Sequence, residues 1–330
     1  MSDLLIVADA ESRRFGLCVA RGRATAADAP TLVDEMLALA VDVAIVRVDA
    51  TDDAAAQAFA AHGLSPLHAD CLVTWGTDLG AGAPTLALAP GGALRDAQPD
   101  DAAAIEGLVA AVFGDYPNHY RANPWFDPAG AAAGYAEWAL AHIGRAERTC
   151  WVHEVDGRIV GLACAALDSA GAVATGNLHG VHPAFARRGI YRAMIQATLA
   201  HYAEHGARSF SIATQAGNLA VQRAWAGLGL LPRRCEQTFH LSTLFGRALA
   251  APAVGVAPDD AARVLLEGHA RACGGAALAN ARIHLRADAG RATTLRSARV
   301  ARRDGRSAAT TLAQDGAGRV IGWMASDPIP

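Results

Sequence analysis

Residues 181–195 read Val-His-Pro-Ala-Phe-Ala-Arg-Arg-Gly-Ile-Tyr-Arg-Ala-Met-Ile, and this stretch decides the fold. The pattern predicts the end of a strand, a tight turn that contains Gly189, and a helix that begins abruptly after the turn. The first amides of a helix have no intrahelical acceptor, and the helix dipole adds positive charge at the same end. We therefore expect a pyrophosphate to bind the backbone N–H groups of Arg188, Gly189, Ile190 and Tyr191.

Composition and charge limit the classes of protein to consider. The chain has 330 residues and a formal net charge of -3, and all 29 of its basic residues are arginine. Such a length allows two or three domains, and the charge argues against a nucleic-acid partner. Charged residues interrupt every apolar run, and the N-terminus, Met1-Ser2-Asp3, does not begin a cationic signal peptide. We expect a cytoplasmic protein with no membrane partner.

The 6 cysteines are scattered singly, without a Cys-x-x-Cys pair. They are expected to be reduced thiols in the core, so neither a metal site nor a disulfide framework is predicted.

Three segments follow one another along the chain. Residues 1–85 alternate strand-like and helix-like stretches and predict an α/β subdomain, which ends in a linker rich in Gly, Ala and Pro at 76–92. Residues 86–248 are expected to form a mixed sheet with flanking helices. Expected helices span 101–113, 129–143, 190–204 and 218–228, and expected strands span 149–155, 158–167, 173–181, 208–214 and 236–243. Residues 249–330 predict a helix at 258–273 followed by antiparallel strands.

The turn at residues 186–191 resembles the acyl-CoA pyrophosphate loop of the GNAT superfamily of N-acetyltransferases, Gln/Arg-x-x-Gly-x-Gly/Ala. Ala186 stands where the family has Gln or Arg, and Tyr191 stands where it has Gly or Ala. Both departures concern side chains, whereas the family holds the phosphates mainly through backbone amides. The resemblance implies an α/β (α+β) fold of GNAT type with acetyl-CoA as acyl donor. The residues expected at the donor are Val181, Arg187, Arg188, Gly189, Ile190, Tyr191, Arg192 and Asn218.

Stretches at 11–21, 121–138 and 213–218 look like one branch of this superfamily, the TDP-fucosamine N-acetyltransferases. This resemblance implies that the N-terminal segment is a truncated partner subdomain. It also implies that the acceptor is the amine of a nucleotide-linked amino sugar. The C-terminal segment resembles part of a hot-dog domain of acyl-CoA thioesterases. The alternative for that segment is a β-rich appendage that covers the core or pairs subunits, which leaves a homodimer open.

Acyl transfer to an amine needs a base for the amine, a polarised carbonyl and a proton for the leaving thiolate. Similar enzymes polarise the carbonyl with a backbone N–H of the strand that ends here at Val181. Asn177 falls where some members carry a catalytic Glu, and an amide cannot act as a base. Strand alternation places His179 on the same face as Asn177, so His179 is the candidate base, with a purely structural role as the alternative.

Asn218 and Trp225 lie on the helix expected after the strand at 208–214. Asn218 opens this helix, so it is either an N-cap or a contact to the coenzyme arm, or both. Trp225 stands where many related enzymes have a Tyr that protonates the thiolate, and an indole N–H donates a hydrogen bond but hardly gives up its proton. We expect Tyr191 to lie too near the pyrophosphate to replace that Tyr.

The loop at residues 113–121 concentrates aromatic and polar groups in a chain with 6% aromatic residues. Such a segment suits stacking on a sugar or base, with Arg121 near a phosphate; the alternative is an aromatic plug under the loop. The expected acceptor contacts are Tyr116, His119, Tyr120, Arg121 and Asn177.

The sequence therefore predicts an acetyl-CoA-dependent N-acetyltransferase that acts on a small amine by direct attack. One alternative is a related acyltransferase with another amine or a longer acyl donor. The other is a non-catalytic acyl-CoA-binding module, which Ala186 and Trp225 would favour.

Overall fold

The computed structural model describes residues 4–80, 91–168, 170–301, 305 and 307–328. The chain forms two compact units. The first comprises Met1–Asp70, His119–Asp127 and Gln237–Pro330, and the second comprises Cys71–Asn118 and Pro128–Glu236. The division into 1–85, 86–248 and 249–330 stays a prediction. Its first boundary and the middle of the expected linker lie at 81–90, outside the described residues.

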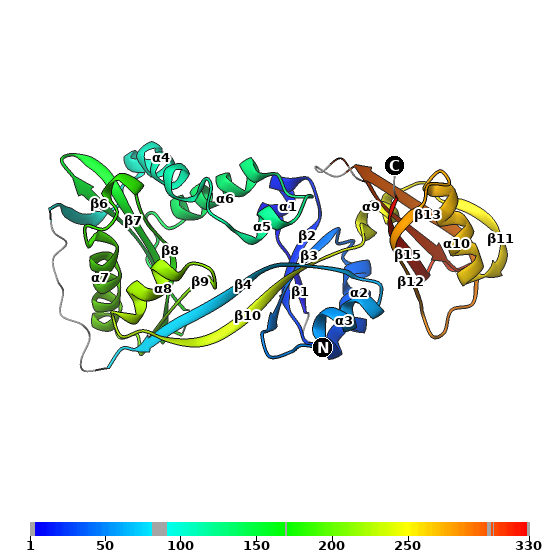
Figure 1. Ribbon diagram of the computed structural model, residues 1–330, viewed down its shortest axis with the longest axis horizontal. Helices are drawn as coiled ribbons and strands as arrows, with labels where there is room; N and C mark the ends of the chain where they lie inside the picture. Colours follow the sequence, from blue (N-terminus) through cyan, green and yellow to red (C-terminus); the bar gives the residue numbers. More distant parts are fainter. Residues whose placement is uncertain (1–3, 81–90, 169, 302–304, 306, 329–330) are drawn as a thin grey trace. The chain divides into compact units, whose positions relative to one another are not determined.

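The second unit is built on a mixed sheet (Figure 1). Its strands are hydrogen-bonded in the order β10-β4-β9-β8-β7-β6-β5, and only β8 and β9 are parallel among the pairs whose register is known. The strands are β4 (Ser65–Asp78), β5 (Ala93–Asp96), β6 (Arg148–Val155), β7 (Arg158–Leu167), β8 (Val173–Val181), β9 (Ser209–Gln215) and β10 (Leu231–Ser242). Both β4 and β10 are long strands of which one part belongs to each unit.

Helices cover both faces of this sheet. They are η2 (Pro99–Asp101), α4 (Ala102–Phe113), α6 (Pro128–Leu140), η3 (Pro183–Phe185), α7 (Ile190–Glu204) and α8 (Leu219–Ala226). Along β7, Leu162 and Cys164 pack in the cluster that contains α4 and α6, whereas Ala163 and Ala165 pack in clusters that contain α7. Successive side chains of a strand point to opposite faces, so α4 and α6 lie on one face and α7 on the other.

One hairpin shows how closely local sequence determines this sheet. Asp156 and Gly157 connect β6 to β7, and their φ angles are 49° and 74°. Two consecutive positive φ values are the signature of a type I′ turn, which Asp-Gly favours. The strands expected at 149–155 and 158–167 are therefore confirmed, and this turn joins them.

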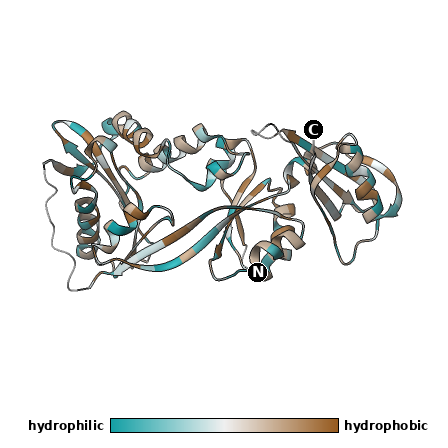
Figure 2. Ribbon diagram, viewed as in Figure 1, coloured by the Kyte–Doolittle hydropathy of each residue, from teal (hydrophilic) through white to brown (hydrophobic). Residues whose placement is uncertain are grey.

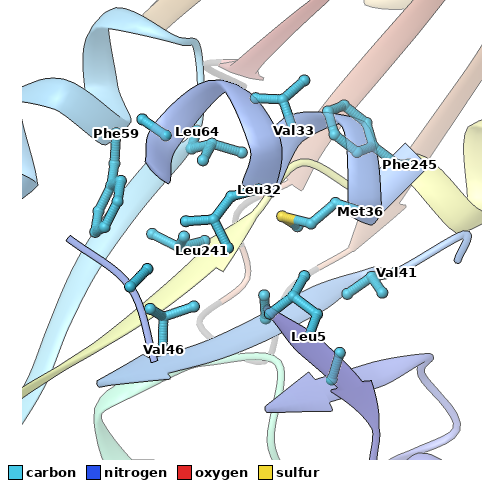
Figure 3. Packing of buried hydrophobic residues seen from close by; sticks show 14 of the residues in the cluster. Leu5, Leu32, Val33, Met36, Val41, Val46, Phe59, Leu64, Leu241 and Phe245 are labelled. Atoms are coloured by element: carbon cyan, nitrogen blue, oxygen red, sulfur yellow. The ribbon is translucent and has the colours of Figure 1, made fainter. Parts of the chain in front are cut away.

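The first unit contains β1 (Leu5–Val7), α1 (Asp9–Phe15), β2 (Val19–Arg23), η1 (Ala26–Asp28), α2 (Ala29–Ala38), β3 (Val43–Asp49), α3 (Ala55–Ala61), α5 (His119–Ala122) and α9 (Phe245–Ala250). Its strands are ordered β1-β2-β3-β10. Figure 3 shows side chains of α2, among them Leu32 and Met36, packed with Leu241 of β10 and Phe245 of α9. β3 is buried on both faces, as expected of its nearly continuous apolar sequence.

The same unit contains an antiparallel sheet from the C-terminal segment, ordered β11-β13-β14-β15-β12. Its elements are β11 (Val254–Asp260), α10 (Ala261–Ala272), β12 (Leu278–Leu285), β13 (Arg291–Ala301), β14 (Ser307–Gln314) and β15 (Val320–Pro328). In Figure 2, α10 mixes hydrophobic and hydrophilic residues. Its buried positions, Ala261, Val264, Leu265, Gly268 and His269, have the spacing of one helix face.

The fold class predicted from the sequence is confirmed, because a large mixed sheet with flanking helices is followed by a helix and an antiparallel sheet. Among the described residues, no helix combines the length and apolar character needed to cross a bilayer.

Candidate active site

The turn before α7 has the backbone that the sequence predicts for an anion site. Gly189 is the N-cap of α7 and has a left-handed φ of 82°, which glycine adopts without steric cost. The first helical hydrogen bond runs from the Ala193 N–H to the Gly189 carbonyl, at 3.0 Å. Within the described ranges, no protein acceptor pairs with the five backbone N–H groups from Arg188 to Arg192. These N–H groups are therefore available to an anion.

The arginine side chains of this turn have different surroundings. Arg188 stacks over the ring of Phe185, with 4.8 Å between the guanidinium carbon and the ring centroid. Arg192 donates to the carbonyl of Gly227 at 2.9 Å, which ties the first turn of α7 to the end of α8. Arg187 is exposed and has a left-handed φ of 62°, which is unusual for a residue with a Cβ atom.

The strands β8 and β9 part before either of them ends. Their parallel pairing runs from Val173 with Ser209 to Gly176 with Ile212, and β8 then continues to Val181. The edge of β8 that faces β9 therefore has no ladder partner over its last residues. Val181 lies at this end, and the role of its backbone N–H at an acyl carbonyl stays a prediction.

A β-bulge in β8 overturns one expectation. Cys164 pairs with Leu178 and Ala165 pairs with Gly176, so Asn177 is an extra residue on β8. The Nδ2 atom of Asn177 lies 2.8 Å from Nε2 of His142, just after α6. The Nε2 atom of His179 instead lies 3.4 Å from Oγ1 of Thr198 on α7. The prediction that Asn177 and His179 share one face is therefore wrong.

The surroundings of His179 favour its neutral form. Burial, with a smaller contribution from His142, lowers the pKa of His179 to about 3. Its Nδ1 atom is buried and has no hydrogen-bond partner among the described residues. His179 is thus a neutral imidazole, with one ring N–H and no second proton.

Four polar side chains meet where β9 ends and α8 begins. The Asn218 Nδ2 atom donates to Thr214 Oγ1 at 3.0 Å and to the Tyr116 hydroxyl at 3.2 Å, and that hydroxyl also contacts Thr214 and Gln215. Asn218 occupies the N-cap position of α8, but its side chain makes no capping bond. The structure therefore brings together Tyr116 and Asn218, which were predicted separately as acceptor and donor contacts.

Trp225 is buried, with 1% of its surface exposed, and its indole N–H donates to the hydroxyl of Tyr191 at 3.2 Å. Burial raises the pKa of Tyr191, so this hydroxyl keeps its proton at neutral pH. Tyr191 was expected to lie too near the pyrophosphate to replace the usual Tyr, and this stays a prediction. Its side chain does reach from the first turn of α7 to Trp225.

The loop at residues 113–121 does not act as one segment. Tyr116 belongs to the second unit, whereas α5 belongs to the first. There, His119 Nδ1 lies 3.0 Å from His240 Nε2, and the Tyr120 hydroxyl contacts Glu11 and Arg21. Arg121 is exposed. The side chains of His119 and Tyr120 are therefore engaged in hydrogen bonds within the first unit.

Thr214, Gln215 and His142 were not predicted as site residues. Thr214 and Gln215 end the strand before Asn218, and the spacing of four residues between Thr214 and Asn218 could have indicated their contact. Nothing in the sequence indicates His142, because its contact with Asn177 depends on the bulge. Within the described ranges, no group of three or more His, Cys, Asp or Glu side chains is placed to hold a metal ion.

Solved structures that are similar to this chain share little sequence with it. A functionally unknown conserved protein from Staphylococcus epidermidis is 9% identical, with a TM-score of 0.51 over 73% of this chain and 92% of that one. A GCN5-related N-acetyltransferase from Sphaerobacter thermophilus is 18% identical, with a TM-score of 0.49 over 72% of this chain and 74% of the other. A tandem GNAT protein from the clavulanic acid biosynthesis pathway is 17% identical, with a TM-score of 0.47 over 68% and 74%.

Curated protein sequences contain no match to this chain. Residues 112–230 do match the family model described as Acetyltransferase (GNAT) family. This range includes the β8 bulge, the turn at Gly189, all of α7 and the Asn218 cluster. Over residues 112–230 the chain is therefore similar to acetyltransferases of the GNAT family.

Proposed function

We propose that the second unit transfers the acetyl group of acetyl-CoA to the amino nitrogen of a small acceptor, an amino sugar linked to a nucleotide. The observation that carries the proposal is the row of unpaired amides from Arg188 to Arg192, beside the end of the strand that parts from β9. The same site then offers N–H groups to a pyrophosphate and a strand edge to an acyl carbonyl.

Donor binding follows from this arrangement. The amides of Gly189, Ile190 and Tyr191 would hold the pyrophosphate, and the end of β8 at Val181 would present its backbone to the thioester. Asn218, which makes no capping bond, has an amide oxygen left to receive an N–H from the pantetheine arm. Acetyl-CoA supplies the activated acyl group, and direct attack by the amine requires no covalent intermediate on the protein.

The acceptor proposal rests on fewer residues than the sequence indicated. Tyr116 and Asn177 are retained as contacts, whereas Arg121 belongs to the first unit, and its contact with a phosphate stays a prediction. The hydrogen bonds of His119 and Tyr120 within the first unit argue against a direct role for either. The nucleotide-linked sugar is proposed from the resemblance to TDP-fucosamine N-acetyltransferases, and the cytoplasm is the proposed compartment.

We assign the base to His179 and a hydrogen bond to the leaving thiolate to Tyr191. His179 is neutral at physiological pH and its Nδ1 atom has no partner among the described residues, so it can accept the amine proton, although its low pKa makes it a weak base. Burial raises the pKa of Tyr191, so its hydroxyl, which accepts the indole N–H of Trp225, would donate a hydrogen bond to the thiolate and keep its proton. The proton taken up by His179 would then neutralise the sulfur.

A pair of glycine variants tests the donor site. Gly189→Val fills the left-handed N-cap of α7, and Gly206→Val puts the same side chain at φ 85° just beyond the other end of that helix. Each carries a strain of about 1–2 kcal/mol, because a Cβ atom disfavours this conformation. Calorimetry should show acetyl-CoA binding strongly weakened by Gly189→Val and retained by Gly206→Val. Equal affinities would contradict the donor site.

The C-terminal sheet is compatible with a second candidate function, in which the acyl donor is longer than acetyl-CoA. Its five strands with α10 packed on them agree with the proposed likeness to part of a hot-dog domain, a fold that handles acyl-CoA thioesters. Competition between acetyl-CoA and longer acyl-CoA donors measures whether the acyl chain is longer than acetyl.

A further inference from the structure

His142 is a buried histidine that contacts the bulge of β8 but has no part in the proposed donor site. It lies just after α6, and 1% of its surface is exposed. Its Nδ1 atom lies 2.8 Å from the carbonyl oxygen of Trp138, and its Nε2 atom lies 2.8 Å from Nδ2 of Asn177. All three residues belong to the second unit, so both contacts lie within one compact part of the chain.

The carbonyl of Trp138 decides which ring nitrogen of His142 carries the hydrogen. A carbonyl oxygen only accepts, so Nδ1 must donate. Burial lowers the pKa of His142, so the ring is neutral at neutral pH and has no second hydrogen. Nε2 is therefore an acceptor, and only the Nδ2 end of the Asn177 amide can donate to it. The tautomer of His142 thus fixes the orientation of this amide, with Oδ1 turned away from the imidazole.

The Oδ1 atom of Asn177 remains available to a ligand. It has no hydrogen-bond partner among the described residues, and it is not one of their fully buried polar atoms. Asn177 is the extra residue of the β8 bulge, and β9 pairs with β8 only as far as Gly176. A bulge re-aims a side chain. Asn177 therefore stands where the free edge of β8 begins, with an accepting oxygen open to a ligand.

We propose that His142 is a positioning residue, which holds the Asn177 amide so that Oδ1 accepts an N–H from the acceptor amine. This inference rests on the proposed function, in which Asn177 contacts the acceptor. An amine keeps N–H donors after it has lost a proton, so Oδ1 can hold it while its lone pair stays free for attack. In the opposite orientation, Nδ2 would donate to that lone pair and compete with the acyl carbonyl for it.

The same geometry selects the class of nucleophile. A hydroxyl group has a single hydrogen, which it must give up in order to attack, so a deprotonated alcohol has nothing left to donate to Oδ1. The orientation that His142 imposes on Asn177 therefore favours an amine over an alcohol as acceptor.

The backbone contact of His142 is shared with other histidines of the chain. His62 and His205 place Nδ1 at 2.9 Å and 2.7 Å from the carbonyl oxygens of Ala58 and His201, also four residues earlier. Such a contact satisfies a carbonyl at the end of a helix. His142 differs from both in its contact with Asn177. His205 is the matched control, because it belongs to the same unit.

Heteronuclear NMR of the full chain with labelled histidine reads the tautomer without any substrate. The signals of His142 are identified by their loss in His142→Gln. We expect a hydrogen on Nδ1 and none on Nε2 at neutral pH. Asn177→Asp replaces the donor by a carboxylate, which only accepts, so Nε2 should then gain a hydrogen. A hydrogen on Nε2 of the wild-type protein would overturn the proposal.

Steady-state kinetics with TDP-fucosamine as the acceptor measures the consequence for the reaction. His142→Leu removes the acceptor of the Asn177 amide and should raise the KM for TDP-fucosamine about tenfold, with the KM for acetyl-CoA unchanged. His142→Gln offers a carbonyl oxygen to Nδ2 and should stay near the wild-type value, as should His205→Leu. In Asn177→Ala, the addition of His142→Leu should raise this KM no further, because the side chain that His142 positions is absent.

The outcomes separate this inference from the proposed function. A wild-type KM for TDP-fucosamine in His142→Leu, or additive effects in the double variant, would overturn the positioning role. If His142→Leu fails to bind acetyl-CoA, its fold is lost, and the NMR signals of the wild-type protein and of Asn177→Asp decide. A wild-type protein that binds acetyl-CoA but does not acetylate TDP-fucosamine would contradict the proposed acceptor instead, and the tautomer of His142 would then decide the inference.

Discussion

Acid should destabilise the first unit through His240. This side chain is fully buried; its Nε2 atom lies 3.0 Å from Nδ1 of His119, and its Nδ1 atom lies 3.1 Å from Nδ2 of Asn123. Burial is the main cause that lowers its pKa to about 3, from 6.5, and the charge of Arg21 acts in the same direction. Between these two values the unfolded chain binds a proton that the folded chain excludes, so stability falls as the pH falls.

The magnitude follows from the two pKa values. Lowering the pH from about 7.5 to about 5 should cost about 2 kcal/mol of unfolding free energy through His240 alone. His119 adds a loss of the same sign, because burial lowers its pKa as well. His240→Gln should remove the contribution of His240 and flatten the pH dependence, whatever its effect on stability at neutral pH.

Urea titration with pulsed hydrogen exchange and mass spectrometry can measure this, because peptides of β10 report on the first unit separately. The exchange pulse is given at one fixed pH. His68→Gln is the control, since His68 is an exposed imidazole in the same unit. The reasoning is refuted if His240→Gln retains the full wild-type loss between pH 7.5 and 5.

Three further predictions concern the acetyltransferase. Trp225→Tyr should raise turnover by supplying an ionisable hydroxyl, and Trp225→Phe should lower it by removing the donor to Tyr191; steady-state rates of the Phe variant equal to wild type would exclude a role for the indole. His179→Ala should lower turnover by about 10²-fold with acetyl-CoA affinity intact, as loss of a base does, and wild-type turnover would make His179 structural. Truncation after Gly246 should leave acetyl-CoA binding intact but expose the apolar residues of the N-terminal segment that pack on Trp323, and sedimentation would detect the changed oligomer. Loss of acetyl-CoA binding in a folded product would contradict the domain assignment.

Short sequence patterns were sufficient to predict many of the helices and strands of the second unit. The helix expected at 190–204 is α7, residue for residue, because Gly189 marks its start by a conformation that other residues avoid. The hairpin at Asp156 and Gly157 was predictable for the same reason. Both features depend on the backbone preferences of one or two residues, and these preferences can be predicted from the residue types alone.

Side-chain partners were not predictable in this way. Asn218 has the sequence position of an N-cap and occupies it, yet its amide turns to Thr214 and to Tyr116, which lies 102 residues away along the chain. Tyr191 was predicted only as a residue of the phosphate turn, and its hydrogen bond with Trp225 depends on how α7 packs beside α8. Contacts of this kind depend on tertiary packing, and the spacing of residues within one helix or strand does not reveal that packing.

The bulge at Asn177 has the largest consequence for the mechanism. Alternation along a strand has a period of two, and one extra residue reverses the face of every side chain beyond it. The sequence around Asn177 contains no proline and shows no break in its apolar pattern, because the bulge arises from the pairing of β8 with β7. His179 consequently lies with Val181 on the side of α7, while Asn177 turns to His142 on the side of α6. An acceptor that contacts Asn177 must therefore pass the free edge of β8, where β9 no longer pairs with it, in order to reach His179. The proposed chemistry places the acyl carbonyl at this same edge.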